Sequence, residues 1–224
     1  DEYSDIGRAF GAQMVDISIG SKTHINLLDL PDLDRLDDED DDPIGDKANL
    51  LMGLFESILS EVTDAQIGII DRVTGATYER YLTENFTPTL KEWHQVLKEQ
   101  PEPEAQDLAL AVETYTTGSQ DIFAHSTNVD LNHRFVIFNL KKLSHKLKPF
   151  ALMVIQDYIW NQIVENQGKC TTWVYFDEMQ ILFKNKAQAD FFTTLYSRIR
   201  KYGAIPTGIT QNVETLAAVE EGRK

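Results

Sequence analysis

The sequence predicts an α/β fold in which a mostly parallel sheet carries an inserted, all-helical subdomain. Three observations lead to this prediction. Strand-like and helical segments alternate over residues 134–210, which is the order that right-handed crossovers and parallel strands require. Residues 46–118 show helical periodicity throughout. One strand-like run, residues 171–176, ends in Asp177 and Glu178, and ligands of parallel sheets bind at such carboxyl ends.

Three blocks follow from these patterns. Residues 1–45 are expected to form the first part of the α/β domain, with a short helix that stops near Gly11 and a strand over 13–17. Residues 46–118 are expected to form the helical subdomain, and residues 119–224 the second part of the α/β domain. No internal repeat is apparent.

Four helices are expected in the middle block. The start signals are Asp46 for the first, Thr63 with Gln66 at capping-box spacing for the second and Thr87 before Pro88 for the third. Pro101 and Pro103 break the third helix, and the fourth stops at Gly118. Four short helices in succession are typical of a small helical bundle.

The third block contains the elements that define the sheet. Strands are expected over 134–139, 171–176 and 205–210, the last weakened by Pro206. Two helices join them, and each should bury one face; the face residues are Leu152, Ile155, Ile159 and Ile163 in the first helix and Phe191, Phe192, Leu195 and Ile199 in the second.

The bulk composition restricts the partners. The chain has 224 residues and a net charge of −15, so free association with DNA or RNA is opposed unless positive charge is concentrated locally. The acidic run 37–42 is interpreted as a solvated loop. Lys141, Lys142, His145, Lys146 and Lys148 form a local basic cluster that favours loop solubility over contact with a nucleic-acid backbone. The single cysteine, Cys170, excludes an internal disulfide and is expected to pack beside a strand.

The candidate site gathers at two strand ends. An apolar strand ending in two acids is a weak signal by itself, because many loops begin with acids. The next strand improves it, since Gln211 follows that strand and could hydrogen-bond a γ-phosphate or an attacking water. The alternative is that Gln211 starts a loop or caps the next helix. Arg198, Arg200 and Lys201 end the intervening helix, where cations favour the helix dipole or could serve as an arginine finger.

A phosphate-binding loop is not found in the sequence. Residues 20–23, Gly-Ser-Lys-Thr, resemble the end of a P-loop, but Ser21 and Asp16 stand where the two glycines of that motif belong. No helix signal follows. The histidines are scattered without the spacing of metal ligands.

These segments resemble the large conjugative-transfer ATPases of type IV secretion systems, the fourth VirB-class protein, in the form found in Gram-positive conjugative elements. The matching segments are residues 20–26, 172–178, 200–203 and 205–212, the last being the most specific. The similarity spans nearly the whole chain and is weak over the middle helices.

The resemblance implies a RecA-like ATPase domain with ATP and Mg²⁺ as cofactors. Asp177 would be the Walker B acid that holds Mg²⁺ through water, Glu178 the base that activates the attacking water, and Gln211 the γ-phosphate sensor. Arg200 is preferred over Arg198 as the arginine that acts on a neighbouring subunit, and Arg198 remains a nucleotide contact.

The implied partners are other subunits of the same ATPase, in a hexamer for example, together with channel components and the coupling protein; DNA is a further candidate. The expected location is cytoplasmic, at the inner face of the cell membrane. The family's P-loop precedes the segment that resembles residues 1–19, so the chain is expected to be a fragment that hydrolyses ATP negligibly alone. A non-enzymatic interaction module and a stand-alone magnesium phosphohydrolase remain as alternatives.

Overall fold

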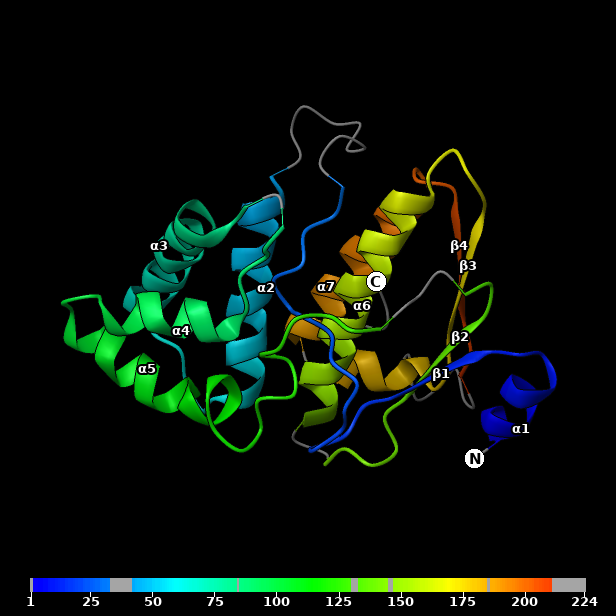
Figure 1. The fold of residues 1–224 in the computed structure, drawn as a ribbon, viewed down its shortest axis with the longest axis horizontal. Coiled ribbons are helices and arrows are strands. Elements are labelled where there is room, and N and C mark those ends of the chain that lie inside the picture. Colours follow the sequence, from blue (N-terminus) through cyan, green and yellow to red (C-terminus); the bar gives the residue numbers. More distant parts are fainter. Residues whose placement is uncertain are drawn as a thin grey trace.

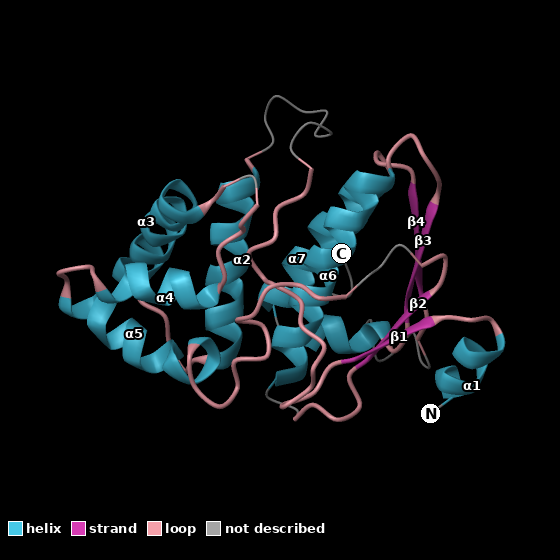
Figure 2. Ribbon diagram, viewed as in Figure 1, coloured by secondary structure: helices cyan, strands magenta, loops and turns pink. Residues whose placement is uncertain are grey.

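Helices make up most of this molecule, and its short strands lie together at one side (Figure 1). The computed structural model describes residues 2–32, 42–83, 85–129, 133–144, 147–184 and 186–210. Figure 2 shows α2 to α5 as a helical layer at the opposite side, with α6 and α7 between that layer and the strands. The mixed α/β class predicted from the sequence is confirmed.

The strands form two parallel pairs. β1 (Gln13–Asp16) pairs with β2 (Val136–Asn139), and β3 (Thr172–Phe176) pairs with β4 (Ala204–Gly208). The parallel direction is as predicted, but within the described residues the strands do not form one continuous sheet. In Figures 1 and 2 the two pairs run in different directions, so their edges do not align into a common ladder.

Pro206 is accommodated in β4 because of its position in the ladder. Ile209 donates its N–H to the Phe176 carbonyl at 2.8 Å and accepts from the Met179 N–H at 2.9 Å, so both of its backbone groups face β3. Alternate residues of a strand face opposite sides, and the backbone of Pro206 therefore faces away from β3. The missing N–H of proline costs no hydrogen bond to β3 at this position.

The helical layer consists of α2 (Pro43–Ile58), α3 (Asp64–Tyr81), α4 (Leu90–Lys98) and α5 (Pro103–Thr116). The predicted capping box of α3 is confirmed, since Thr63 and Gln66 exchange their side-chain bonds at 3.0 and 3.3 Å. The predicted cap of α2 is wrong. Asp42 occupies that position, accepting from the Gly45 N–H at 2.9 Å, because Pro43 suits the first helical turn.

Two further helices connect the layer to the strands. α6 (Leu147–Asn166) is buried on nearly all sides, so the expectation of a single buried face is wrong for it. Its first half packs into the large core of the helical layer, which includes Phe55 and Trp93. Its last turns, with Ile163 and Val164, pack with α7 (Lys186–Ile199) and β3 in a second cluster.

The remaining elements are α1 (Glu2–Ala9) and η2 (Met179–Lys184), a 3-10 helix directly after β3. Gly11 ends the turn after α1 with a φ of 65°, as its position near the predicted helix end suggested. Cys170 is exposed in the turn before β3, so the predicted packing role is wrong. This turn reverses the chain between α6 and β3, and its side chains face solvent.

Candidate functional site

Asp177 and Glu178 follow β3 directly and are both exposed. The register pairs Phe176 with Gly208, so the carboxyl ends of β3 and β4 lie side by side. Beyond the strands, two backbone hydrogen bonds of Ile209, to Phe176 and Met179, hold together the segments that follow β3 and β4. The contact between them thus extends past the two acids. The predicted neighbourhood of these strand ends is therefore confirmed.

Glu178 has an unusual backbone conformation. Its φ is 50°, and no other non-glycine residue among those described has a positive φ. Its N–H bonds the Oδ1 atom of Asp177 at 2.9 Å, which holds the turn in place. A side-chain-bearing residue in this region is strained, and such strain is concentrated at functional sites.

Asp177 has a partner that the sequence did not indicate. Its Oδ2 atom accepts a hydrogen bond of 2.8 Å from the hydroxyl of Tyr3 in α1, 174 positions away in the sequence. Gly7 brings α1 close to the first strand pair, because a Cβ there would lie 2.8 Å from Ile137 Cδ1 and 2.9 Å from Met14 Sδ. The Asp177 carboxylate thus has one fixed orientation, with lone pairs left for another ligand.

The end of β4 completes the site. Thr210 Oγ1 donates to Gln180 Oε1 at 2.8 Å, so the chain is still beside η2 one residue before Gln211. Gln211 itself lies outside the described residues. Gly208 lies close to Met179, because a Cβ there would stand 2.0 Å from Met179 Sδ and a larger residue would force the methionine side chain to move.

The two predicted arginines lie at the other end of the strand pair. Arg198 and Arg200 precede β4, whose first residue, Ala204, is in register with Thr172 at the start of β3. Four residues of strand, about 13 Å, separate that end from the end that carries the acids. Arg198 forms an ion pair of 2.9 Å with Asp46 of α2, whereas Arg200 is exposed.

The segment that resembles a P-loop is a turn in the structure. Gly20 has a φ of 77°, and Ser21 Oγ donates to the Asp16 carbonyl at 3.0 Å. Within residues 18–32, all of them described, no helix follows. The expectation that these residues do not form a strand–loop–helix cradle is confirmed.

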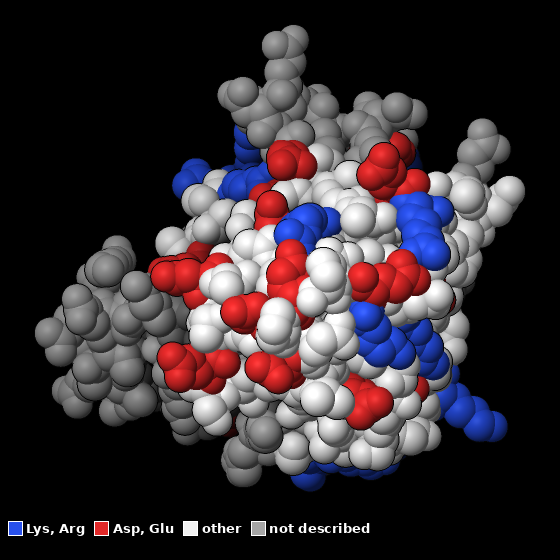
Figure 3. Space-filling view, turned by 90° about the vertical axis from the view of Figure 1, so that its left-hand side faces the viewer, with Lys and Arg blue, Asp and Glu red and all other residues white. Residues whose placement is uncertain are grey.

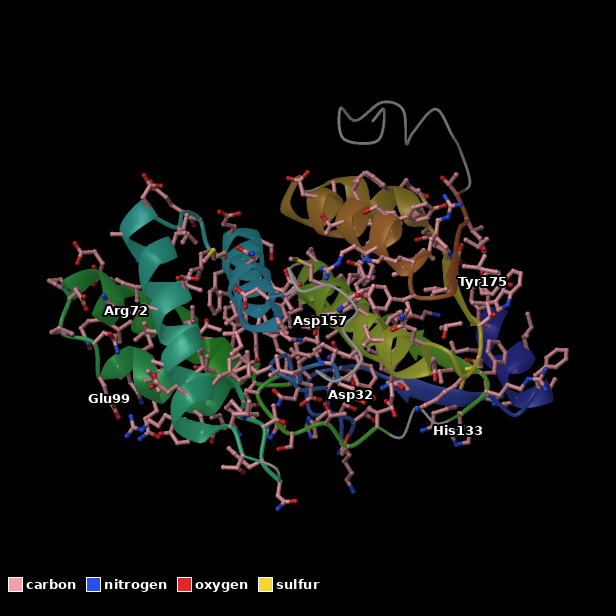
Figure 4. The ribbon with its side chains drawn as sticks, turned by 90° about the horizontal axis from the view of Figure 1, so that it is seen from above. Asp32, Arg72, Glu99, His133, Asp157 and Tyr175 are labelled. Atoms are coloured by element: carbon pink, nitrogen blue, oxygen red, sulfur yellow. The ribbon has the colours of Figure 1, made fainter. Side chains whose placement is uncertain are left out.

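A buried polar cluster lies between α2 and α6, and sequence reasoning missed it. Lys47 forms an ion pair with Asp157 of α6, and Asp29 accepts from Thr127 and Asn26 nearby. Figure 4 shows Asp157 at the centre of the molecule, facing α2. Burial raises the pKa of both carboxyl groups above the usual range. The burial of Lys47 was hard to predict from the sequence, because a lysine just after a helix start is usually exposed at the surface.

The chemistry of the strand-end site suits a hard cation held through water. Two exposed carboxylates and nearby hydroxyl and amide oxygens are the groups that Mg²⁺ accepts in its hydrated form. Among the described residues, no group of three or more His, Cys, Asp or Glu side chains could bind a metal ion directly. Within the same residues, no helix is sufficiently long and apolar to cross a bilayer.

Charged side chains of both signs are interspersed on the outer face of the helical layer (Figure 3). Arg72 with Glu102 and Arg80 with Glu99 form exposed ion pairs there. This face therefore carries no uniform basic patch among its described residues. In the predicted basic cluster, Lys141 and Lys142 are exposed after β2, while His145 and Lys146 lie outside the described residues.

Comparison with known proteins supports the fold prediction. No protein-family model and no curated protein matches the sequence. The solved structure of VirB4 of Thermoanaerobacter pseudethanolicus is similar with a TM-score of 0.78 and 21% sequence identity, over 99% of this chain and 62% of that chain. The bacterial conjugative coupling protein TrwB has a TM-score of only 0.42 at 14% identity, over 98% of this chain and 61% of that one.

The first of these similarities extends over almost all of this chain, which in turn spans less than two thirds of the VirB4 structure. The sequence pattern and the three-dimensional comparison agree. The predicted resemblance is confirmed at the level of the fold: this chain has a VirB4-like fold.

Proposed function

We propose that this chain is the nucleotide-hydrolysing domain of a type IV secretion ATPase, a motor that powers the transfer of DNA or protein. The observation that carries the proposal is the strained turn of Asp177 and Glu178 beside the end of β4, in a VirB4-like fold. Ligands of parallel sheets bind at this end of the strands. The finer assignment is a RecA-like domain, with residues 46–118 as its helical insertion.

The two acids have different roles in this proposal. Asp177, fixed by Tyr3 and by the Glu178 N–H, would hold the hydrated Mg²⁺ of Mg-ATP. The bound ion supplies positive charge beside the phosphates. Glu178 would accept the proton of the attacking water, a task that suits an exposed carboxylate directly after the strand end. Gln211, which follows Thr210, would contact the γ-phosphate.

The arginines would act on another subunit. Arg200 is exposed and lies at the opposite end of the strands from the acids, a placement that suits contact with a neighbouring nucleotide. Arg198 is already paired with Asp46, which favours Arg200 for this role. We place the assembled motor at the cytoplasmic face of the membrane, bound to channel components and the coupling protein.

The proposal is tested by ATP turnover and ATP binding in the full-length parent protein. Glu178→Gln should abolish turnover and leave ATP binding intact, because only proton transfer is lost. Asp177→Ala should weaken Mg-dependent binding as well. Glu113→Gln, on the exposed face of α5, is a matched control and should leave both unchanged. Equal loss of binding in Glu178→Gln would contradict the assignment of the base.

The isolated chain provides a second test. Its sequence has no complete P-loop motif to bind the β- and γ-phosphates, since its one adjacent Gly-Lys pair, Gly168-Lys169, is followed by Cys170 and has Ile163 where the first glycine belongs. Its own turnover should therefore be negligible. Turnover by the isolated chain that disappears in Asp177→Ala would overturn this expectation. A second candidate function is a non-enzymatic module that binds other channel proteins through the helical layer, and a parent protein without a P-loop would favour it.

A further inference from the structure

Tyr3 of α1 reaches the strand-end acids from a distant part of the sequence. Its hydroxyl donates to Asp177 Oδ2 at 2.8 Å, and the Glu178 N–H donates to Asp177 Oδ1 at 2.9 Å. Each oxygen of this carboxylate therefore has a donor from the protein. A carboxylate oxygen can accept two hydrogen bonds, so each oxygen retains capacity for a further donor.

The position of Tyr3 is set by the first strand pair. α1 lies beside β1 at the edge of the molecule (Figure 1). In the turn that follows α1, the Ala12 N–H donates to the Gly7 carbonyl at 2.7 Å. The Gln13 N–H then donates to the Phe135 carbonyl at 2.9 Å, directly before β2. Since these bonds and the close approach at Gly7 hold α1 against β1 and β2, a shift of that pair would shift Tyr3.

Asp177 follows the second strand pair. Among the described residues, β1 and β2 share no backbone ladder with β3 and β4. Tyr175, two residues before Asp177, lies on the side of the molecule that carries α1 (Figure 4). The hydrogen bond between Tyr3 and Asp177 thus joins α1 and the first pair to the second pair. It does so at the acid that the proposed function assigns to Mg²⁺.

This hydrogen bond is of a kind that orients an acid. A hydroxyl that donates to an ionised carboxylate forms a charge-assisted hydrogen bond, which is stronger than a bond between neutral groups. Asp177 is exposed, and an exposed carboxylate without fixed partners rotates freely about its Cβ–Cγ bond. With one donor on each oxygen, the Asp177 carboxylate cannot rotate without breaking a hydrogen bond.

An oriented acid suits a hydrated magnesium ion. Mg²⁺ usually keeps several of its waters in proteins, and Asp177 would accept hydrogen bonds from them at its remaining lone pairs. An acid that is already oriented loses less freedom on binding than one that rotates. Loss of a partner that orients a direct metal ligand typically lowers metal affinity by about 10- to 100-fold. The effect should be smaller at Asp177, because its contact is through water.

We propose that Tyr3 is a positioning residue for the magnesium site, an inference that rests on the proposed ATPase function. Its hydroxyl holds Asp177 in the orientation that accepts the waters of Mg²⁺. Because α1 carries Tyr3, the orientation of this acid depends on where β1 and β2 lie relative to β3. Tyr3 acts through Asp177, so its loss should raise the Mg²⁺ requirement and spare the proton transfer to Glu178.

ATP turnover of the full-length parent protein, measured against free Mg²⁺ at saturating ATP, tests the proposal. Tyr3→Phe removes only the hydroxyl. It should raise the Mg²⁺ concentration for half-maximal turnover about threefold to tenfold and keep turnover at saturating Mg²⁺ within about twofold of the wild type. Tyr196→Phe on α7 is the matched control, because Tyr3 and Tyr196 are both 40% exposed, and it should change neither value. An unchanged Mg²⁺ requirement in Tyr3→Phe, or a loss that excess Mg²⁺ does not restore, would overturn the proposal.

Urea unfolding of the isolated chain tests the hydrogen bond without any activity. Tyr3→Phe should lower the unfolding midpoint of the native chain and leave the midpoint of Asp177→Ala unchanged, because the acceptor is then already missing. Equal shifts in both backgrounds would show that the hydroxyl does not act on Asp177 and would overturn the inference. A wild-type parent without ATP turnover would contradict the proposed function and this inference together, whereas failure of the inference alone leaves wild-type turnover intact.

Discussion

At the scale of single residues, Glu178 has a conformation that disfavours any side chain. Left-handed backbone costs an L-residue about 1–2 kcal/mol, and glycine avoids this cost while losing more entropy on folding. We therefore expect Glu178→Gly to raise the free energy of unfolding by up to about 1 kcal/mol in urea titrations. Glu113→Gly, inside α5, should lower it by about 1 kcal/mol instead. A loss of stability in both variants would show that Glu178 is not strained.

The buried carboxyl of Asp29 leads to a prediction about pH. Burial raises its pKa above the ordinary value of 3.8, although the Thr127 hydroxyl and the charge of Lys47 oppose this shift. A carboxyl with a raised folded pKa stabilises the fold at low pH, and this contribution is lost as the pH rises through the folded pKa. The stability of the native chain relative to Asp29→Asn should therefore fall as the pH is raised above about 4. Urea titrations across this range measure the difference, and a rising difference would contradict the assignment.

The sequence could indicate some of the site at this scale. Asp177 and Glu178 stand at a strand end in the chain itself, so their exposure beside β4 followed from the alternation of strands and helices. Tyr3 could not be predicted in the same way, because its hydrogen bond to Asp177 joins positions 174 residues apart. The roles of Arg198, Arg200 and Gln211 remain proposals.

At the scale of elements, α4 depends on a reciprocal cap. Thr89 Oγ1 accepts from the Lys91 N–H at 3.2 Å, and the Glu92 carboxylate accepts from the Thr89 N–H at 2.8 Å. We expect Thr89→Ala to lower the free energy of unfolding by about 1 kcal/mol, whereas Thr89→Ser should retain most of it. Thermal unfolding of the two variants is the measurement. An equal loss in both would indicate that the methyl group, not the cap, stabilises this turn.

Local patterns predicted the starts of helices unevenly. The Thr63–Gln66 capping box could be predicted from the sequence, because its two polar side chains accept from backbone N–H groups that are unpaired at every helix start. The predicted start of α4 at Thr87 is wrong, because Thr89 is the cap and forms a capping box with Glu92. The all-round burial of α6 was not predictable from periodicity, since it depends on α2, α7 and β3 packing on different sides of it.

At the scale of the whole molecule, α6 belongs to both large hydrophobic clusters. Phe150 and Val154 lie in the core of the helical layer, while Ile163 and Val164 lie in the core that includes β3 and α7. Asp157 stands between these two stretches and is paired with Lys47 of α2. Because one rigid helix is shared, the two cores should unfold together. The domain boundaries at 45 and 118 stay a prediction.

The Lys47–Asp157 pair is where this cooperativity can be tested. Lys47→Met leaves a buried carboxylate without its cation and should cost about 3–5 kcal/mol, and Asp157→Leu should cost a similar amount. The double variant should lose much less than the sum, because apolar side chains can replace a buried ion pair at little cost. Urea unfolding followed by far-UV circular dichroism and by tryptophan fluorescence should give coincident curves for all four proteins. Additive losses would show that the pair is not coupled, and separate transitions would show that α6 does not unite the two cores.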